Sequence, residues 1–291
     1  MINLWYDSSY WSHTGGRLSG PEIVVKNTLA ALEQEKVPFA VNEDKYSYNF
    51  IMQYNALGHK KHEHLEHESC FIGPQFWGWD EYGRFLFENP QYYNKLIVPS
   101  EWVRYQLFSP PFNVPKDKLA VWPVGIDIPD FEKSSYVEWD CLIYFKRRDK
   151  KELNQVTQFL DSKKMSYNIL GYGNYSQEEL LDACKKSSFC FLLNGTESQG
   201  IAVQEIMATN TPLLVWEVKE WNDMGEEYRT PATTIPYWNA CCGEIFDNIA
   251  DLPNTFSKFY DRIEEFTPRL FVENELSYKK SLEILFSIMN A

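Results

Sequence analysis

The segment FCFLLNGTESQGIAVQEIMATNTPLLV, from Phe189 to Val215, contains the strongest indications of the fold. The uninterrupted apolar run Phe189 to Leu193 is typical of a buried parallel strand, and a polar loop containing two glycines follows it. The apolar spacing then predicts a helix over Ile201 to Thr209 and a second buried strand over Leu213 to Trp216. This segment therefore predicts a strand, helix and strand of one parallel sheet.

The same alternation continues along the 291 residues, a length that fits two domains or one large α/β domain. The stretch from Gly125 to Trp139, which carries Pro129, is the predicted linker between two such series. Two consecutive parallel sheets imply a cleft between them, with ligands at the carboxyl ends of the strands. Helices are predicted over Glu22 to about Glu35 and around Glu275 to Met289, and further strands at Ile2 to Tyr6, Phe39 to Val41, Phe50 to Gln53, Phe71 to Gly73, Leu96 to Pro99, Leu119 to Trp122, Leu142 to Phe145 and Tyr167 to Leu170.

The composition excludes several classes of protein. Hydrophobic residues make up 44% and charged residues 24% of the chain, which is typical of a folded globular protein. A formal charge of -13 argues against a nucleic-acid partner, because such binding depends on Lys and Arg that neutralise phosphates. No apolar run long enough for a transmembrane segment occurs, and the six cysteines lack a C-x-x-C pair. We therefore expect a cytoplasmic protein.

Two glutamates flank the start of the predicted helix. Glu197 lies in the preceding loop, and Glu205, eight positions later, is expected on the first helical turn, so both carboxylates can approach one bound molecule. A carboxylate accepts two hydroxyl hydrogens at once, which suits a sugar or ribose diol, and backbone N–H groups at a helix start bind anions. An equally weighted alternative is that Glu205 only favours the helix dipole and that Glu197 is a solvated loop residue.

At these residues the chain resembles the retaining glycosyltransferases of family 4 (group 1), which have a GT-B fold. Their motif E-x-F-G-x-x-x-x-E-A-M-A-x-G-x-P-V is matched at Glu197, Gly200, Glu205, Met207, Ala208 and Pro212. Asn210 stands where the family has glycine, and asparagine tolerates the left-handed backbone. Five further segments are similar, in the family's order, and extend the resemblance to most of the chain: Gly15-Gly16, IVPSEWVRYQLF (Ile97 to Phe108), VWPVGIDIPDF (Val121 to Phe131), FKRRDKK (Phe145 to Lys151) and CGEIF (Cys242 to Phe246).

The sequence departs from the family pattern in the phosphate motif G-R-x-x-x-K-G. Lys146 replaces the glycine, and several basic residues follow it closely. The motif therefore does not separate Arg147 from Arg148, or Lys150 from Lys151, and Arg147 and Lys151 are the favoured pair. A solvated helix start is the alternative interpretation of this basic run.

The resemblance implies a fold, a division into domains and an activity. The fold is α/β, a GT-B fold in which two Rossmann-like domains with parallel sheets face a cleft. Residues 1–128 form an N-terminal acceptor-side domain, residues 129–267 a C-terminal nucleotide-sugar-binding domain, and residues 268–291 a helix that packs back on the N-terminal domain. The implied activity is transfer of a sugar from a nucleotide-sugar donor to a carbohydrate or other hydroxyl acceptor, with retention and without a metal or cofactor.

The resemblance also implies roles for individual residues. Glu197 holds the donor sugar, and Arg147 and Lys151 stabilise the negative charge that develops on the leaving diphosphate. Glu205 holds the ribose. The other implied donor-binding residues are Ser198, Gln199, Gly200, Ile201, Tyr172, Gly173, Asn174, Gly15 and Gly16, and the acceptor-side residues are His13, Arg17 and Gln75. A surface loop without a binding role is the alternative for Gly15 to Arg17.

Other functions and a metal site are also considered. The alternatives are a catalytically silent nucleotide-sugar-binding protein, and an epimerase or phosphorylase on the same scaffold. A nicotinamide oxidoreductase is disfavoured because no G-x-G-x-x-G follows a strand. The four clustered histidines lack an H-E-x-x-H register, so a solvated charged helix is favoured over a zinc site: His59, His62, His64 and His67.

Overall fold

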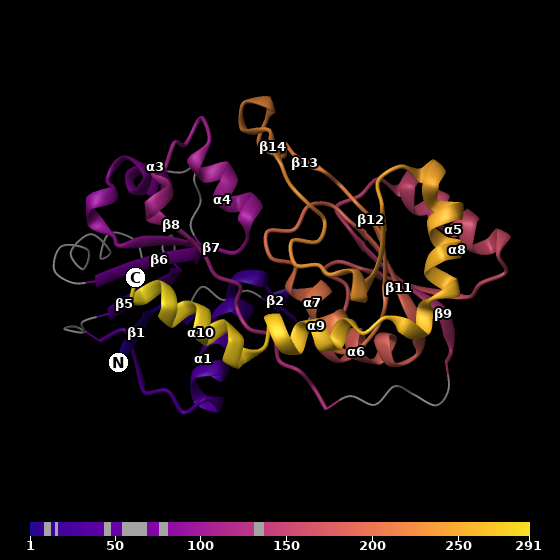
Figure 1. Cartoon of the computed structure of the whole chain (residues 1–291), viewed down its shortest axis with the longest axis horizontal. Coiled ribbons are helices and arrows are strands. Elements are labelled where there is room, and N and C mark those ends of the chain that lie inside the picture. Colours follow the sequence, from indigo (N-terminus) through magenta and orange to yellow (C-terminus); the bar gives the residue numbers. More distant parts are fainter. Residues whose placement is uncertain (9–12, 15–16, 44–47, 54–68, 76–80, 131–136) are drawn as a thin grey trace.

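The structure, a computed structural model of the whole chain, describes residues 1–8, 13–14, 17–43, 48–53, 69–75, 81–130 and 137–291. It consists of two halves that lie side by side along the long axis of the molecule, each with a parallel sheet and flanking helices (Figure 1). Among the described residues, no helix has both the length and the apolar character needed to cross a membrane.

The first half is built on a sheet of six parallel strands in the order β4-β1-β5-β6-β7-β8. From the adjacent strands β1 and β5, the sheet continues with β4 on one side and with β6, β7 and β8 on the other, as in doubly wound α/β proteins. The strands are β1 (Ile2–Trp5), β4 (Phe39–Val41), β5 (Tyr48–Gln53), β6 (Ser69–Gln75), β7 (Lys95–Val98) and β8 (Leu119–Val121), and the helices are α1 (Gly20–Gln34), α3 (Glu81–Glu88) and α4 (Glu101–Phe108). A short antiparallel pair, β2 (His13–Thr14) and β3 (Arg17–Leu18), precedes α1.

The second half has a sheet of five parallel strands in the order β10-β9-β11-β12-β15. A hairpin of β13 (Glu220–Trp221) and β14 (Thr230–Pro231) leaves this half after β12 and extends toward α4 (Figure 1). The strands are β9 (Trp139–Lys146), β10 (Tyr167–Gly171), β11 (Ser187–Asn194), β12 (Leu213–Trp216) and β15 (Gly243–Phe246), and the helices are α5 (Lys150–Ser162), α6 (Gln177–Lys185), α7 (Ile201–Ala208), α8 (Leu252–Asp261) and α9 (Pro268–Glu275). The last helix, α10 (Tyr278–Met289), packs on the first half.

The apolar run of β11 is continuous because both faces of this central strand are covered. Cys190 and Leu192 pack in one cluster with residues of α6 and α7. Phe189, Phe191 and Leu193 pack in a second cluster with residues of α5 and α8. All five side chains are fully buried, so a strand with one polar face would not fit here.

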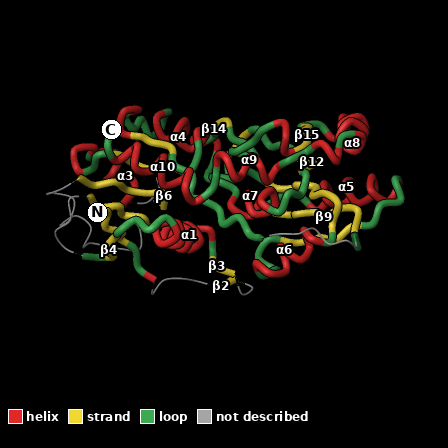
Figure 2. Tube along the Cα trace, turned by 60° about the horizontal axis from the view of Figure 1, so that its bottom comes forward, coloured by secondary structure: helices red, strands yellow, loops and turns green. Residues whose placement is uncertain are grey.

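The helix expected around Glu275 to Met289 is present as α10, which begins at Tyr278, but the segment 268–291 contains another helix, α9, before it. The structure has two helices, because Ser277 adopts an extended conformation and its side chain caps α10 by accepting the N–H of Lys280. The second helix, α10, lies against α1 of the first half (Figures 1 and 2). Trp122 donates its indole N–H to the carbonyl of Ser281 over 2.9 Å, which fixes α10 to the end of the first sheet.

Candidate functional site

The ends of β9 and β11 form the floor of the candidate site. Both strands are parallel, so Lys146 and Asn194, their last residues, lie at the same edge, and the N–H of Gly195 donates to the carbonyl of Lys146 over 2.8 Å. The chain then enters α7 through Gly200, whose φ of +81° is a left-handed conformation that favours glycine. Because α7 begins at Ile201, Glu205 is beyond the first turn, and its predicted place on that turn is wrong.

Glu197 is the most enclosed acidic group at this edge. It is only 8% exposed, so it is not a solvated loop residue. Lys146 Nζ lies 2.7 Å from one carboxylate oxygen and 2.9 Å from the other, and Asn194 Nδ2 donates to the first oxygen over 2.9 Å. The Lys146 ammonium also lies 4.4 Å from the centre of the Tyr172 ring. The buried carboxylate is therefore neutralised and held in one orientation.

The backbone of Glu197 is held from both halves of the molecule. Trp102 of α4 donates its indole N–H to the Glu197 carbonyl over 2.8 Å. The Glu197 N–H donates to the carbonyl of Thr233 over 3.0 Å. The Tyr237 hydroxyl donates to the carbonyl of Pro99, a neighbour of α4, over 2.6 Å. The loop that carries Glu197 thus lies at the boundary between the two sheets.

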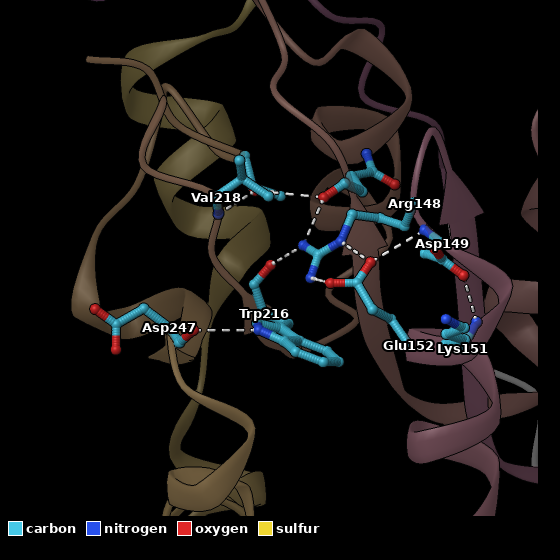
Figure 3. Close-up of polar contacts among 9 residues, drawn as sticks. Arg148, Asp149, Lys151, Glu152, Trp216, Val218 and Asp247 are labelled. Atoms are coloured by element: carbon cyan, nitrogen blue, oxygen red, sulfur yellow. Dashed lines mark hydrogen bonds and ion pairs between the residues drawn. The ribbon is translucent and has the colours of Figure 1, made fainter. Parts of the chain in front are cut away.

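Arg148 has a different position and a structural role (Figure 3). Its side chain is 6% exposed and donates to both carboxylate oxygens of Glu152, over 2.7 and 2.6 Å. It also donates to the carbonyls of Asn194 and Trp216, over 3.1 and 3.0 Å, and its guanidinium lies 4.7 Å from the Trp216 ring centre. Arg148 therefore ties α5 to the ends of β11 and β12, and its donors are largely used by the fold.

Arg147 and Lys151, the favoured phosphate ligands, are both exposed. Arg147 has a left-handed φ of 51°, and its guanidinium lies 4.0 Å from a carboxylate oxygen of Asp223 in the hairpin. It lines a pocket of about 210 Å³ together with Gly195 and Thr196. Lys151 lies on the first turn of α5, where its backbone N–H donates to Asp149. It is Lys146, rather than either of these residues, that contacts Glu197.

Glu205 and Gln199 face the junction of the two halves. Glu205 is half-buried on α7, close to Tyr278 at the start of α10. Burial raises the pKa of the Tyr278 hydroxyl, and the negative charges of Asp127 and Glu205 raise it further. Gln199 is 4% exposed, and its amide accepts the N–H of Val124 over 3.0 Å and donates to the carbonyl of the same residue over 2.9 Å. Its side chain thus binds the main chain just before the predicted linker.

The other predicted donor residues lie on two loops of the second half. Tyr172 follows β10, is 51% exposed and covers the Lys146 ammonium. Gly173 has a φ of +82°, and Asn174 and Ser198 are exposed. The structure therefore brings Tyr172, the first residue of this loop, next to Lys146, the partner of Glu197.

The residues predicted in the first half are only partly described. Gly15, Gly16 and all four clustered histidines lie outside the described residues. His13 and Arg17 lie in the paired strands β2 and β3. Gln75 is the last residue of β6 and donates its amide N–H to the carbonyl of Pro21 in α1. Within the described part of the chain, no three His, Cys, Asp or Glu residues are grouped as a metal site.

Three contacts of the site were not predicted from the sequence: those of Lys146, Asn194 and Trp102 with Glu197. The available signal for Lys146 was its place in the phosphate motif, where the family has glycine. Asn194 at the end of a buried strand and Trp102 at a helix start gave no indication of their partner.

The structural neighbours of the chain are glycosyltransferases of the GT-B type, and the chain has this α/β fold with its two parallel sheets. Sucrose-phosphate synthase from Thermosynechococcus elongatus aligns with a TM-score of 0.61 at 11% identity, over 98% of this chain and 97% of that one. A glycosyltransferase from Rickettsia africae ESF-5 aligns with a TM-score of 0.58 at 10% identity, over 99% and 97%.

TarM from S. aureus, solved with UDP, aligns with a TM-score of 0.54 at 12% identity over 90% of this chain. This chain spans only 58% of the length of TarM. No protein-family model matches the chain, and no curated protein matches its sequence. At these identities the likeness establishes the fold.

Proposed function

We propose that this protein is a glycosyltransferase that moves a sugar from a nucleotide-sugar donor to a carbohydrate or other hydroxyl acceptor, with retention of configuration and without a metal. The observation that carries the proposal is Glu197, a buried carboxylate at the carboxyl end of a central parallel strand, held by a lysine and an asparagine. Ligands of open α/β sheets bind at this edge. The GT-B fold supports the same conclusion, and retention rests on the resemblance of the motif around Glu197.

In the proposed reaction, the anomeric C–O bond of the donor breaks and the nucleoside diphosphate leaves with growing negative charge. A new anomeric C–O bond forms to the oxygen of the acceptor hydroxyl, whose proton passes to the leaving diphosphate. Cations and N–H donors directed at that charge lower the barrier. We assign this role to Arg147 and Lys151, with the backbone at Gly200 and Ile201 assisting. Charge stabilisation by these groups is what makes a metal unnecessary in the proposal.

The remaining donor and acceptor contacts are proposed from the motif positions. Glu197 binds a hydroxyl of the sugar, and Glu205 binds the ribose, since a carboxylate accepts two hydroxyl hydrogens of a diol. Residues 129–267 form the donor side and residues 1–128 the acceptor side. The base lies against the loop of Tyr172, Gly173 and Asn174, next to Ser198 and Gln199, and the first half contributes Gly15, Gly16, His13, Arg17 and Gln75.

The proposal includes a cytoplasmic location. All six cysteines are free thiols in the structure, and five of them are buried. Burial raises the pKa of the Cys70 thiol to about 12, so this group stays protonated at neutral pH. Unpaired cysteines support a reducing compartment.

The test is a screen of thermal stability with UDP-, GDP- and ADP-sugars. A donor at 100 times its dissociation constant adds about 2.7 kcal/mol to the stability of the folded state. The donor that raises the melting temperature is then incubated with the protein without acceptor, and release of the nucleoside diphosphate is followed. Glycosyl transfer to water at a rate above the protein-free control supports the enzyme. If no nucleotide sugar changes the melting temperature, the proposed function is wrong.

A further inference from the structure

Lys146 has no role in the proposed transfer, yet it makes the closest contacts with Glu197. It stands where the resembled motif has glycine, so the contact is a feature of this chain. The ammonium lies 2.7 and 2.9 Å from the two carboxylate oxygens, and the side chains of Lys146 and Glu197 are only 15% and 10% exposed. Each of the two groups is therefore the main compensation for burial of the other.

The neighbours of this ion pair keep it in place. Asn194, fully buried, donates its Nδ2 to the same carboxylate, which fixes the orientation of its amide. The Tyr172 ring covers the ammonium at 4.4 Å, a distance at which the ring face attracts a cation. A carboxylate has about four acceptor positions, and these contacts occupy three of them. As far as the described residues show, Glu197 thus keeps one acceptor position for a sugar hydroxyl.

The ion pair of Lys146 and Glu197 also sets the charge that a bound anion meets. A nucleoside diphosphate carries several negative charges, and an uncompensated carboxylate in a partly buried site repels them strongly. With Lys146 in contact, Glu197 and its partner carry no net charge together. A site with the carboxylate of Glu197 alone would instead oppose the diphosphate that the proposed reaction brings next to it.

We propose that Lys146 is the positioning residue of Glu197: it fixes the carboxylate in one orientation and neutralises it, so that an anionic nucleoside diphosphate binds beside it. Lys146 acts through Glu197 and not by contact with the phosphates. This inference rests on the proposed function, because it takes the diphosphate of the donor as the neighbouring ligand.

A double-mutant cycle tests the inference, with UDP, GDP and ADP as probes and calorimetry as the measurement. We expect Lys146→Met to weaken nucleoside-diphosphate binding about tenfold, since it leaves the charge of Glu197 uncompensated. Glu197→Gln is expected to leave the affinity unchanged or to increase it. In the double variant, which carries neither charge, the affinity is expected to return to within about threefold of the wild-type value.

Two further variants separate this effect from loss of structure. Lys146→Arg keeps the charge and is expected to retain most of the binding. Lys258→Met removes an exposed lysine of α8 and is expected to leave the affinity unchanged. Circular dichroism and thermal unfolding show whether each variant is folded. If Lys146→Met alone fails to fold, the double variant and Lys146→Arg decide, because both are expected to fold and to bind.

Three results would overturn the inference. A folded Lys146→Met variant that binds within about threefold of wild type shows that neutralisation of Glu197 is not required. A loss that persists in the Glu197→Gln background shows that Lys146 acts on the phosphates directly. If Lys146→Met is unfolded and the double variant does not bind, Lys146 again acts on the phosphates directly. If the wild-type protein binds none of the three nucleotides, the proposed function fails and this inference fails with it.

Discussion

Two glutamates of the second half are each held by a basic residue of the same short run, but their surroundings differ. Arg148 holds Glu152 and also donates to the backbone carbonyls of Asn194 and Trp216. Lys146 holds Glu197, and within the described part of the chain no backbone carbonyl accepts from its ammonium. The guanidinium joins three elements of the fold through its planar set of donors, whereas the ammonium acts as a point charge. The comparison therefore indicates that Arg148 stabilises the fold, whereas Lys146 belongs to the candidate site.

The largest expected effect is the fall in the rate of glycosyl transfer when Glu197 is replaced. Glu197→Gln is expected to lower the rate of glycosyl transfer about 100-fold or more, because it removes a preorganised charged contact with the reacting sugar. The rate is measured with the donor identified by the stability screen. The matched control is Glu178→Gln, an exposed residue on α6, which should keep the wild-type rate. Equal rates for wild type and Glu197→Gln would place Glu197 with Glu152, as a structural residue.

The next effect is on stability. Arg148→Met removes a buried cation with hydrogen bonds to two carbonyls and a carboxylate, so the free energy of unfolding should fall by about 3 kcal/mol. Urea denaturation followed by circular dichroism measures it. Arg147→Met is the control, and it should change stability by less than about 0.5 kcal/mol because its side chain is exposed. A loss as large in the control would remove the distinction between the two arginines.

Arg147 should instead affect donor binding. Arg147→Ala is expected to weaken nucleotide-sugar affinity about 10-fold or more, because each lost charge-assisted hydrogen bond costs roughly 1.5–3 kcal/mol. Calorimetry with the donor measures the change. Should Arg147→Ala combined with Lys151→Ala bind within about threefold of wild type, the assignment of both residues to the diphosphate is wrong.

The smallest expected effect is the change in donor affinity when Tyr172, whose ring covers the Lys146 ammonium, is replaced. Tyr172→Leu keeps an apolar side chain over Lys146 but removes the attraction of the ring for the ammonium, worth about 1 kcal/mol when it is partly desolvated. We expect donor affinity to fall by about fivefold, and Tyr172→Phe to bind as wild type. If the phenylalanine variant binds as weakly as the leucine variant, the hydroxyl of Tyr172 matters and the ring does not.

The fold is largely predictable because local apolar patterns specify it. Strands β4 and β12 have the predicted bounds, Phe39–Val41 and Leu213–Trp216, and α7 ends one residue before its predicted end. The exception is the segment 268–291, which is expected to form a single helix but contains both α9 and α10. The apolar spacing continues through the segment, and the break at Ser277 accompanies long-range contacts of Leu276 and Ser277 with Ile126 of the linker.

The candidate site is less predictable, because it also depends on contacts between residues that lie far apart in the sequence. Glu197 could be found because its loop follows a recognisable strand and resembles a family motif. Its partners could not, because Lys146 and Trp102 are 51 and 95 positions away from it in the sequence. The separate roles of Lys146 and Arg148 also depend on backbone geometry, since Arg147 between them has a left-handed φ that the basic run does not indicate. The phosphate-binding roles of Arg147 and Lys151 stay predictions.

The hydrogen bond from Trp102 to the Glu197 carbonyl has a mechanical consequence. The Trp102 indole, on the first half, donates to the Glu197 carbonyl over 2.8 Å. Glu197 belongs to the second half and is the residue proposed to bind the sugar. A hinge rotation that separates the halves would have to break this bond or drag the loop with it. Opening for product release and loosening of the carboxylate would then be a single event.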